Sequence, residues 1–176
     1  MILHEITRGE NNPVYKALEV SNGARQYDFL RSIVQASLAV DRPFLSQQIL
    51  KAFNYHAIAC LHTNAGEYRP CAVHVGTHQP PPPFLVAAQM DDFVNRVNRW
   101  WEVTDPVYTA SYVLWELNYI HPFINGNGRA ARAAAYYVLC VKAGGWLHGS
   151  TILPELIRRE RDEYVEALKE ADVACS

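Results

Sequence analysis

Five stretches of the chain carry apolar side chains at every third or fourth position with polar residues between them, and a sixth is apolar almost throughout. This spacing is typical of helices that bury one face. Prolines, glycines and capping residues separate the stretches, where helices are expected to begin or end. The pattern predicts an all-α fold, a compact bundle of about six to eight helices. The main helices are expected over residues 27–40, 46–60, 87–101, 106–120, 130–141 and 156–171.

Two helix boundaries have a clear chemical cause. Asp41-Arg42-Pro43 should end the first of these helices, because proline disfavours helical angles in the residue before it. Thr104-Asp105-Pro106 should open the fourth, because it offers a capping side chain followed by proline near the first helical position. The helix over 130–141 is apolar nearly all round, which predicts that it is buried on every side.

The chain reads as a single domain spanning residues 1–176, without an internal repeat or a long linker. Residues 1–26 are polar and interrupted by glycine, asparagine and proline. We expect them to form a loosely packed N-terminal arm with a short helix around residues 15–20. The core is then expected over about 27–172.

The segment from Tyr68 to Gly76 changes from a helical to an alternating period. Four prolines follow at 80–83, and they favour extended geometry and cannot continue a central strand. The simplest interpretation is a surface hairpin or an edge loop, on which prolines would discourage unwanted strand pairing. We therefore predict one short β-hairpin. Its alternating residues are Cys71, Ala72, Val73, His74 and Val75.

The chemistry of the chain is concentrated in residues 121–132, here called the signature loop. Pro122 biases His121 away from helical angles, so the preceding helix should stop there. Two glycines let the backbone turn, and a helix opens directly behind them with free N–H groups, a favourable anion site. Arg129 and Arg132 lie three residues apart and can hold further phosphate oxygens. A base beside a polyphosphate cradle indicates group transfer from a nucleotide.

Composition sets the remaining bounds. The chain has 176 residues, a net charge of −2, 49% apolar and 19% charged residues, as ordinary soluble proteins do. It has no basic footprint for nucleic acid, no apolar run long enough to span a membrane, and no signal-peptide pattern. We expect a cytoplasmic protein with reduced thiols, although a protein delivered into another cell would have the same composition. The spacing of the four cysteines is not that of a metal site. They are Cys60, Cys71, Cys140 and Cys175.

The signature loop resembles that of the Fic proteins, His-x-Phe-x-(Asp/Glu)-Gly-Asn-Gly-Arg-x-x-Arg. The departure is Asn125, where the family usually has a carboxylate that binds magnesium. The segment Gly66-Glu67-Tyr68-Arg69 also resembles the one that precedes a β-hairpin flap in the family. Seven of the eight fixed positions match, namely His121, Phe123, Gly126, Asn127, Gly128, Arg129 and Arg132.

The resemblance implies a protein adenylyltransferase that moves AMP from ATP to a Ser, Thr or Tyr hydroxyl of a target protein. His121 would be the general base, since an imidazole pKa near 6.5 suits that task at neutral pH. Residues 126–128 would form the anion nest, and Arg129 and Arg132 would neutralise the outer phosphates. ATP and Mg²⁺ are the implied donor and cofactor. The target would pair with the flap, whose expected contact residues are Ala72, Val73, His74 and Val75.

Asn125 leaves three functions open. An amide oxygen holds magnesium less tightly than a carboxylate does, so the enzyme could work slowly with metal carried by the nucleotide. It could use another phosphorylated donor, as Fic relatives that transfer UMP, phosphocholine or the γ-phosphate do. Gly128 argues against the γ-phosphate variant, the Doc toxins, which have lysine there. The rival from another class is a non-catalytic module that binds nucleotide or docks a peptide.

Many Fic proteins are restrained by a helix with the pattern (Ser/Thr)-x-x-x-Glu-(Gly/Asn), whose glutamate pairs with the second arginine of the signature. Thr7-Arg8-Gly9-Glu10-Asn11 is one residue too short for this pattern, and Thr151 to Glu155 contains a proline and is followed by leucine. We therefore predict that no glutamate of this chain pairs with Arg132. Restraint, if any, would come from a separate antitoxin-like partner.

Overall fold

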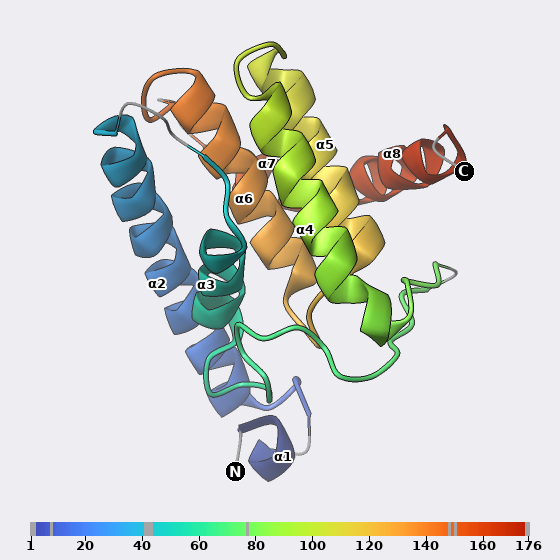
Figure 1. Cartoon of the computed structure of the whole chain (residues 1–176). Helices are drawn as coiled ribbons and strands as arrows, with labels where there is room; N and C mark the ends of the chain where they lie inside the picture. The colour runs from blue at the N-terminus through green and yellow to red at the C-terminus, as the bar shows by residue number, and fades with distance from the viewer. Residues whose placement is uncertain are drawn as a thin grey trace.

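The computed structural model describes residues 3–7, 9–40, 44–76, 78–147, 149 and 151–174 (Figure 1). All named elements in these ranges are helices, which confirms the all-α prediction. The predicted break at Asp41-Arg42-Pro43 lies outside the described residues. The helices are α1 (Leu3–Thr7), α2 (Pro13–Leu38), α3 (Gln47–Ile58), α4 (Pro83–Trp100), α5 (Pro106–Ile120), α6 (Asn127–Lys142), α7 (Leu153–Arg159) and α8 (Arg161–Ala174).

Helix α6 lies at the centre of the bundle, as its apolar pattern predicts. It packs against α5, α2 and α3, and 11 of its 16 residues are buried. Five of the buried residues are alanines, whose small side chains let neighbouring helices approach closely at native packing density. The signature loop enters this helix directly, so the most buried element of the fold fixes the position of the loop.

The predicted N-terminal arm is wrong, because α2 runs as one helix from Pro13 to Leu38. Asn12 caps it by accepting a hydrogen bond from the Val14 N–H, and Pro13 occupies the first turn, where its missing N–H costs nothing. Tyr15 is fully buried. The polar composition of this segment reflects the outer face of a packed helix and does not indicate disorder.

The predicted β-hairpin is also wrong. Among the described residues of this segment the only strand-like pairing is one antiparallel bridge between Val75 and His78. The prolines at 80–83 explain the difference, because they have no N–H groups with which to extend the ladder. Helix α4 begins at Pro83, earlier than expected, with Pro82 as its N-cap. We call residues 71–76 and 78–81 the flap segment, an irregular loop and not a hairpin.

The predicted C-terminal helix is divided in two at Glu160, whose ψ of 44° is not helical. Figure 1 shows α8 turned away from the long axis of the bundle as a result. Two side chains of α8 then reach α5. Asn118 donates to the Tyr164 hydroxyl at 2.9 Å, and Trp115 donates to Asp172 at 2.8 Å. The break therefore brings α8 across the end of α5 that leads to His121.

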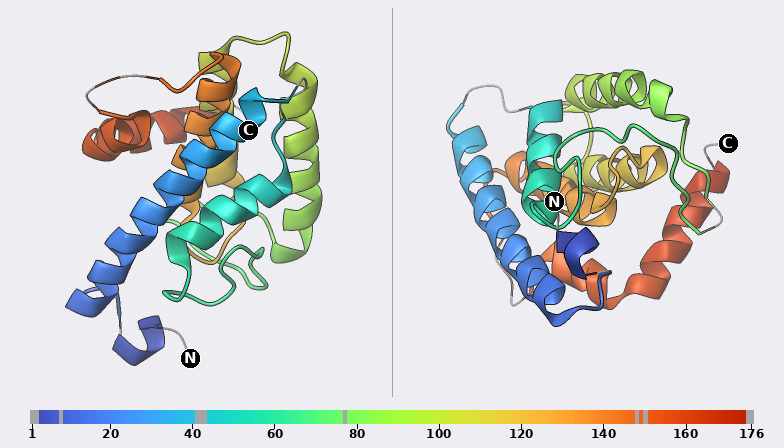
Figure 2. Two further views of the ribbon diagram at one scale, coloured as in Figure 1. Left: turned by 90° about the vertical axis from the view of Figure 1, so that its left-hand side faces the viewer. Right: turned by 90° about the horizontal axis from the view of Figure 1, so that it is seen from below.

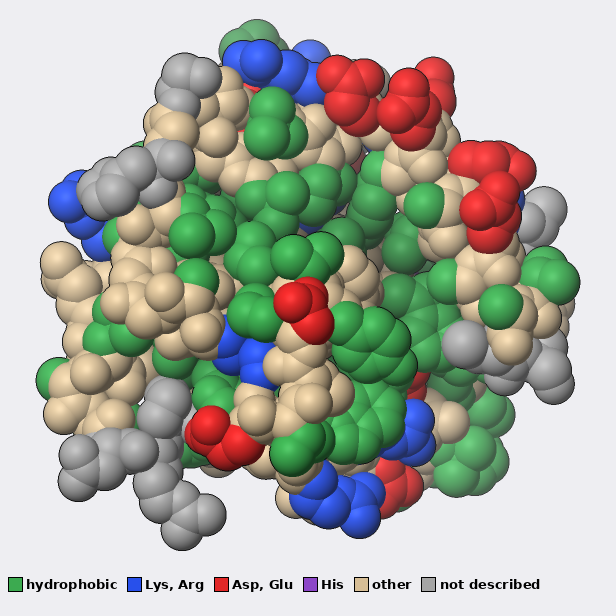
Figure 3. All heavy atoms as spheres, turned by 90° about the horizontal axis from the view of Figure 1, so that it is seen from above, with side chains coloured by type: hydrophobic (Ala, Val, Ile, Leu, Met, Phe, Trp, Pro, Cys, Tyr) green, Lys and Arg blue, Asp and Glu red, His purple; other side chains and the backbone are tan. Residues whose placement is uncertain are grey.

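The two ends of the bundle differ in character. Seen from above, hydrophobic side chains cover the middle of the face, and many acidic side chains gather toward one edge (Figure 3). Seen from below, α1 and the loop after α3 cover the other end, with α2 and α8 on opposite sides of it (Figure 2). The signature loop lies at this lower end. Within the described ranges, no helix has the length and apolar character of a membrane span.

We predict that Gly126→Ala destabilises the fold by roughly 2–4 kcal/mol, measured by urea denaturation. Gly126 has a φ of +75°, and a Cβ there would lie 2.6 Å from a methyl group of Ile58. Gly144→Ala is the matched control, because Gly144 has a φ of +77° but nothing within 4 Å of such a Cβ. The Gly144→Ala variant should be destabilised only by the backbone strain, about 1–2 kcal/mol. Equal losses in both variants would mean that the loop does not pack tightly on α3.

Candidate functional site

His121 occupies the turn at the end of α5. Its backbone is left-handed, with φ 49° and ψ 57°, which ends the helix as Pro122 predicts. The imidazole Nδ1 lies 3.2 Å from the backbone oxygen of Asn118. Because that oxygen can only accept, Nδ1 carries the hydrogen and Nε2 keeps its lone pair. The side chain therefore has the tautomer of a base whose accepting nitrogen is Nε2.

Burial is the main cause of a strongly lowered His121 pKa, to about 4. The hydrogen bond to Asn118 opposes this effect, and the nearby His78 and Arg69 add to it. At neutral pH the imidazole is thus uncharged. A neutral imidazole can accept a proton, and its low pKa makes it a weaker base than a free histidine.

Amide side chains hold the signature loop in shape. The Asn127 side chain accepts from the Phe123 N–H at 2.8 Å and donates to the Phe123 carbonyl at 2.9 Å. The fully buried Asn54 of α3 donates to the Asn125 carbonyl at 2.8 Å and accepts from the Gly66 N–H at 2.9 Å. Asn127 therefore acts on the loop itself through its side chain, and Asn54 ties the loop to α3.

The N-terminus of α6 presents free backbone donors. Its N-cap, Gly126, has no side chain with which to cap them. The first backbone bond of the helix is that of Ala130 N–H to Gly126 O, at 2.9 Å. Within the described part of the chain, the N–H groups of residues 127–129 have no acceptor. Three unpaired donors at a helix N-terminus form an anion site of the kind predicted from the glycines.

The two arginines of the signature differ in their surroundings. Arg129 is engaged within the protein, with an ion pair to Glu19 of α2 at 2.9 Å and a hydrogen bond to the Ala57 carbonyl. Arg132 has no ion pair among the residues described, and burial lowers the pKa of its guanidinium. Arg132 is therefore the signature arginine without a carboxylate partner among those residues. The prediction of a separate inhibitor stays a prediction.

Asn125 does not form a cation site as it stands. Its side-chain oxygen accepts from Arg129 at 3.1 Å, and its side-chain nitrogen donates to Glu10 at 3.2 Å. The oxygen that would meet a magnesium ion is thus turned toward a guanidinium, which repels a cation. No group of three or more His, Cys, Asp or Glu residues suited to a metal occurs among the residues described. The side chains present do not fit a protein-held magnesium ion.

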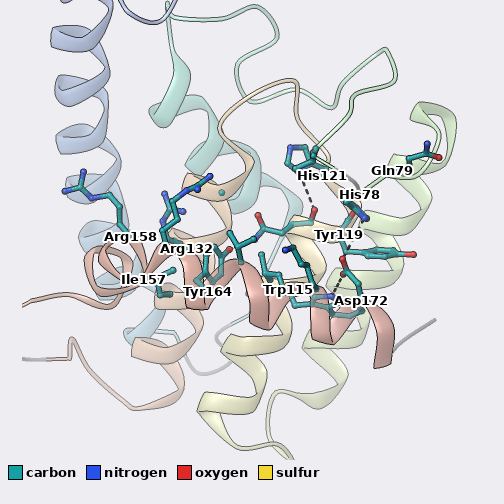
Figure 4. A pocket seen from close by; sticks show the side chains of 18 residues that line it. His78, Gln79, Trp115, Tyr119, His121, Arg132, Ile157, Arg158, Tyr164 and Asp172 are labelled. Atoms are coloured by element: carbon teal, nitrogen blue, oxygen red, sulfur yellow. Dashed lines mark hydrogen bonds and ion pairs between the residues drawn. The ribbon is translucent and has the colours of Figure 1, made fainter.

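Two cavities meet at five residues that line both of them: His121, Gly128, Arg132, Arg158 and Arg161. The larger, about 1070 Å³, lies between the signature loop, α2 and α7 and is lined by charged groups that include Glu10, Glu19 and Arg129. We call it the charged cavity. The other, about 700 Å³, lies between the flap segment, α5 and α8, and we call it the aromatic cavity. One wall of the aromatic cavity is formed by Trp115, Tyr119 and Tyr164. In Figure 4 this wall lies between Arg132 and Arg158 on one side and the flap segment on the other.

The structure brings all the predicted loop residues together but separates the predicted flap contacts. Of the four predicted flap contacts, only Val75 lines the aromatic cavity. His78 and Gln79 line it as well, and the sequence pattern did not indicate them. His78 donates through Nε2 to the Tyr119 carbonyl at 2.8 Å, which fixes its ring beside the cavity. The alternating pattern of the segment gave no signal for His78. Ala72, Val73 and His74 line neither cavity.

Relatives with curated names match this chain. A protein adenylyltransferase Fic of Nematostella vectensis is 36% identical over 114 residues, which are 61% of this chain and 24% of that protein. A protein of the same name from Drosophila persimilis is 29% identical over 162 residues, or 90% of this chain and 30% of the relative. The chain thus spans about a quarter to a third of the length of these relatives.

Solved structures share the fold. Fic-1 (residues 134–508) from C. elegans matches with a TM-score of 0.69 at 24% identity, covering 89% of this chain and 44% of that one. A Fic domain containing signaling protein from Bacteroides thetaiotaomicron matches with a TM-score of 0.70 at 22% identity, covering 89% and 59%. The sequence profile described as Fic/DOC family matches residues 44–139, more than half of the chain. The chain therefore belongs to the Fic/DOC family.

Proposed function

We propose that this domain transfers AMP from ATP to a hydroxyl group of a target protein. One observation carries the proposal: a neutral imidazole lies where a charged cavity, an aromatic cavity and three unpaired backbone donors meet. The two relatives described above are named protein adenylyltransferase Fic, and this name supports the same reaction.

The two cavities suit the two parts of a nucleotide. Aromatic side chains stack favourably on a nucleobase, so the base would occupy the cavity lined by Trp115, Tyr119 and Tyr164. The phosphates would lie on the N-terminus of α6, with Arg132 beside them in the charged cavity. His121 stands at the boundary between the cavities, where the α-phosphate of such a nucleotide would fall.

The reaction then follows from the tautomer of His121. Nε2 takes the proton from the target hydroxyl while its oxygen forms a bond to the α-phosphorus of ATP. The bond from that phosphorus to the bridging oxygen breaks in line, and pyrophosphate leaves with the electron pair. The donors of residues 127–129 and the Arg132 guanidinium stabilise the charge that develops on the phosphate oxygens.

The target would reach His121 past the flap segment. Val75 is 38% exposed, and its neighbours Cys71, Ala72 and His74 are exposed as well. An extended peptide could pair with backbone groups here as it does in strand addition. The described residues of the segment form one bridge, so most of their backbone groups could pair with a target. A separate antitoxin-like protein remains the proposed source of restraint.

The side chain of Asn125 favours a second candidate, a module that binds nucleotide without transferring AMP or that uses another phosphorylated donor. Its amide is held by Arg129 and Glu10 and is not directed at a metal. Parallel incubations of the protein and a cell lysate with α-labelled or γ-labelled ATP separate these functions. AMP transfer labels protein from the α position only. Label from the γ position, or from neither, would contradict the proposal.

We predict that His121→Ala lowers AMP transfer by at least about 100-fold, the usual contribution of a general base. The variant should still bind ATP, measured by calorimetry, because the phosphate donors belong to α6 and not to His121. His56→Ala is the control, since His56 stacks on Phe29 and lines neither cavity. Equal transfer by the two variants would exclude His121 as the base.

The lowered pKa of His121, about 4, predicts the acid side of the pH profile. The base works in its neutral form, which predominates above that pKa and is lost as the pH falls through it. The transfer rate should therefore show no histidine-dependent decline between pH 8 and 5.5. An NMR titration of the His121 ring should have its midpoint near pH 4, and a midpoint near 6.5 would contradict the burial of the imidazole.

We predict that Asn125→Asp tightens Mn²⁺ binding, measured by electron paramagnetic resonance, and raises transfer most at low magnesium. The substitution adds one carboxylate beside the phosphate site with almost no change of size. Asn95→Asp adds the same charge at an exposed position of α4 and serves as the control. If the two variants have the same magnesium curves, position 125 does not control metal use.

A further inference from the structure

Arg69 is a buried cation whose partners are all backbone carbonyl groups. It is 2% exposed, and it is the one charged residue among the buried residues of the described chain. No carboxylate forms an ion pair with it among those residues. An isolated buried charge is costly. Its retention therefore requires the carbonyl dipoles around it, and those carbonyls belong to two different segments.

One set of bonds holds the turn that carries His121. The Arg69 Nε donates to the His121 carbonyl at 2.8 Å, and a terminal nitrogen lies 3.5 Å from the Ile120 carbonyl. The backbone N–H of Arg69 donates to the Pro122 carbonyl at 2.9 Å. Arg69 thus binds three successive carbonyl groups, that of the left-handed His121 and those of its two neighbours.

The other set holds both ends of the flap segment. The terminal nitrogens of Arg69 donate to the Cys71 carbonyl at 3.0 Å and to the Pro81 carbonyl at 2.5 Å. The guanidinium is planar and rigid, with donors in fixed directions. It therefore sets the spacing between the base of the flap segment and the His121 turn. A lysine has a single donor centre and could not reach all of these carbonyls together.

We propose that Arg69 is a positioning residue for the transfer reaction, because its guanidinium fastens both ends of the flap segment to the turn that holds His121. The target is thereby presented at a fixed distance from the base. This inference rests on the proposed function for its catalytic consequence. The link itself is a property of the fold and can be tested without any activity.

The guanidinium also adds a positive charge beside the imidazole. The charged and titratable groups that act on His121 are Arg69, and His78 of the flap segment, while Arg132 of α6 and Tyr164 of α8 line the same cavity. Of these, His78 and Arg69 act with burial to keep the His121 pKa low. Removing the charge of Arg69 should therefore raise that pKa more than Arg69→Lys does, because the lysine variant keeps the charge and both variants loosen the turn.

Three variants test the link: Arg69→Lys keeps the charge, Arg69→Met removes it, and Tyr68→Phe is the control. The control removes only the bond from the neighbouring Tyr68 hydroxyl to Gln47. We expect exchange of the hydrogen-bonded amides to rise about tenfold or more in both Arg69 variants, at Val75 and His78 of the flap segment and at His121 and Phe123 of the turn together. It should not rise in the control. Faster exchange in one segment alone would overturn the link.

The kinetic test compares label transfer from α-labelled ATP to lysate proteins across a range of ATP concentrations. A small misplacement of a reacting group commonly costs about 100-fold, so both Arg69 variants should lower kcat roughly 10- to 100-fold. The KM for ATP should change less than about threefold, because Arg69 lines neither cavity. An unchanged kcat, or a loss confined to KM, would contradict the positioning role.

Two readouts separate this inference from the proposed function. In the unmodified protein the Arg69 Nε–H should be protected from solvent exchange in NMR, and exchange at the rate of an exposed guanidinium would overturn the link even if no variant folded. Arg69→Met should raise the midpoint of the His121 titration, whereas Arg69→Lys should raise it less. If these results hold and no protein is labelled by ATP, the transfer function is wrong and the link stands.

Discussion

The peptide groups of a sharp turn between two buried helices need hydrogen-bond partners, and the rest of this structure depends on how they are supplied. Three side chains supply them: Arg69, Asn54 and Asn127. All three are buried, and an unpaired buried carbonyl or N–H would be costly. These side chains hold the turn in place, and the N–H groups at the start of α6 stay free because the N-cap Gly126 has no capping side chain. The anion site is a direct result.

The charged side chains of the site also have defined partners or none. Burial is the main cause that lowers the pKa of His121 and keeps its imidazole neutral, and His78 and Arg69 add to the effect. Arg129 is neutralised by Glu19, whereas Arg132 lines both cavities and has no ion pair among the residues described. Among the described residues the site thus combines a neutral base with two arginines, Arg132 and Arg161, that line both cavities and form no ion pair. That combination suits the transfer of an anionic group from a nucleotide to a hydroxyl.

The sequence predicted the parts of the fold that depend on local periodicity. The buried character of α6, the cap at Asp105 and the end of α5 before Pro122 all follow from neighbouring residues. The long α2, the irregular flap segment and the break at Glu160 do not, because tertiary contacts decide them. Within the site, the spacing of the signature loop predicted His121 and Arg132. Asn54, Arg69 and His78 act through backbone carbonyls far away in sequence, and a linear pattern does not show such bonds.

We propose that the signature loop is a preformed cradle which divides a nucleotide between two cavities. A crystal structure with a non-hydrolysable ATP analogue would test this arrangement. We expect the phosphates on the N–H groups of residues 127–129 with Arg132 beside them. We also expect the base against Trp115 and Tyr164, and the loop backbone unchanged. A nucleotide bound elsewhere, or with its base in the charged cavity, would show that the loop does not hold a nucleotide in this way.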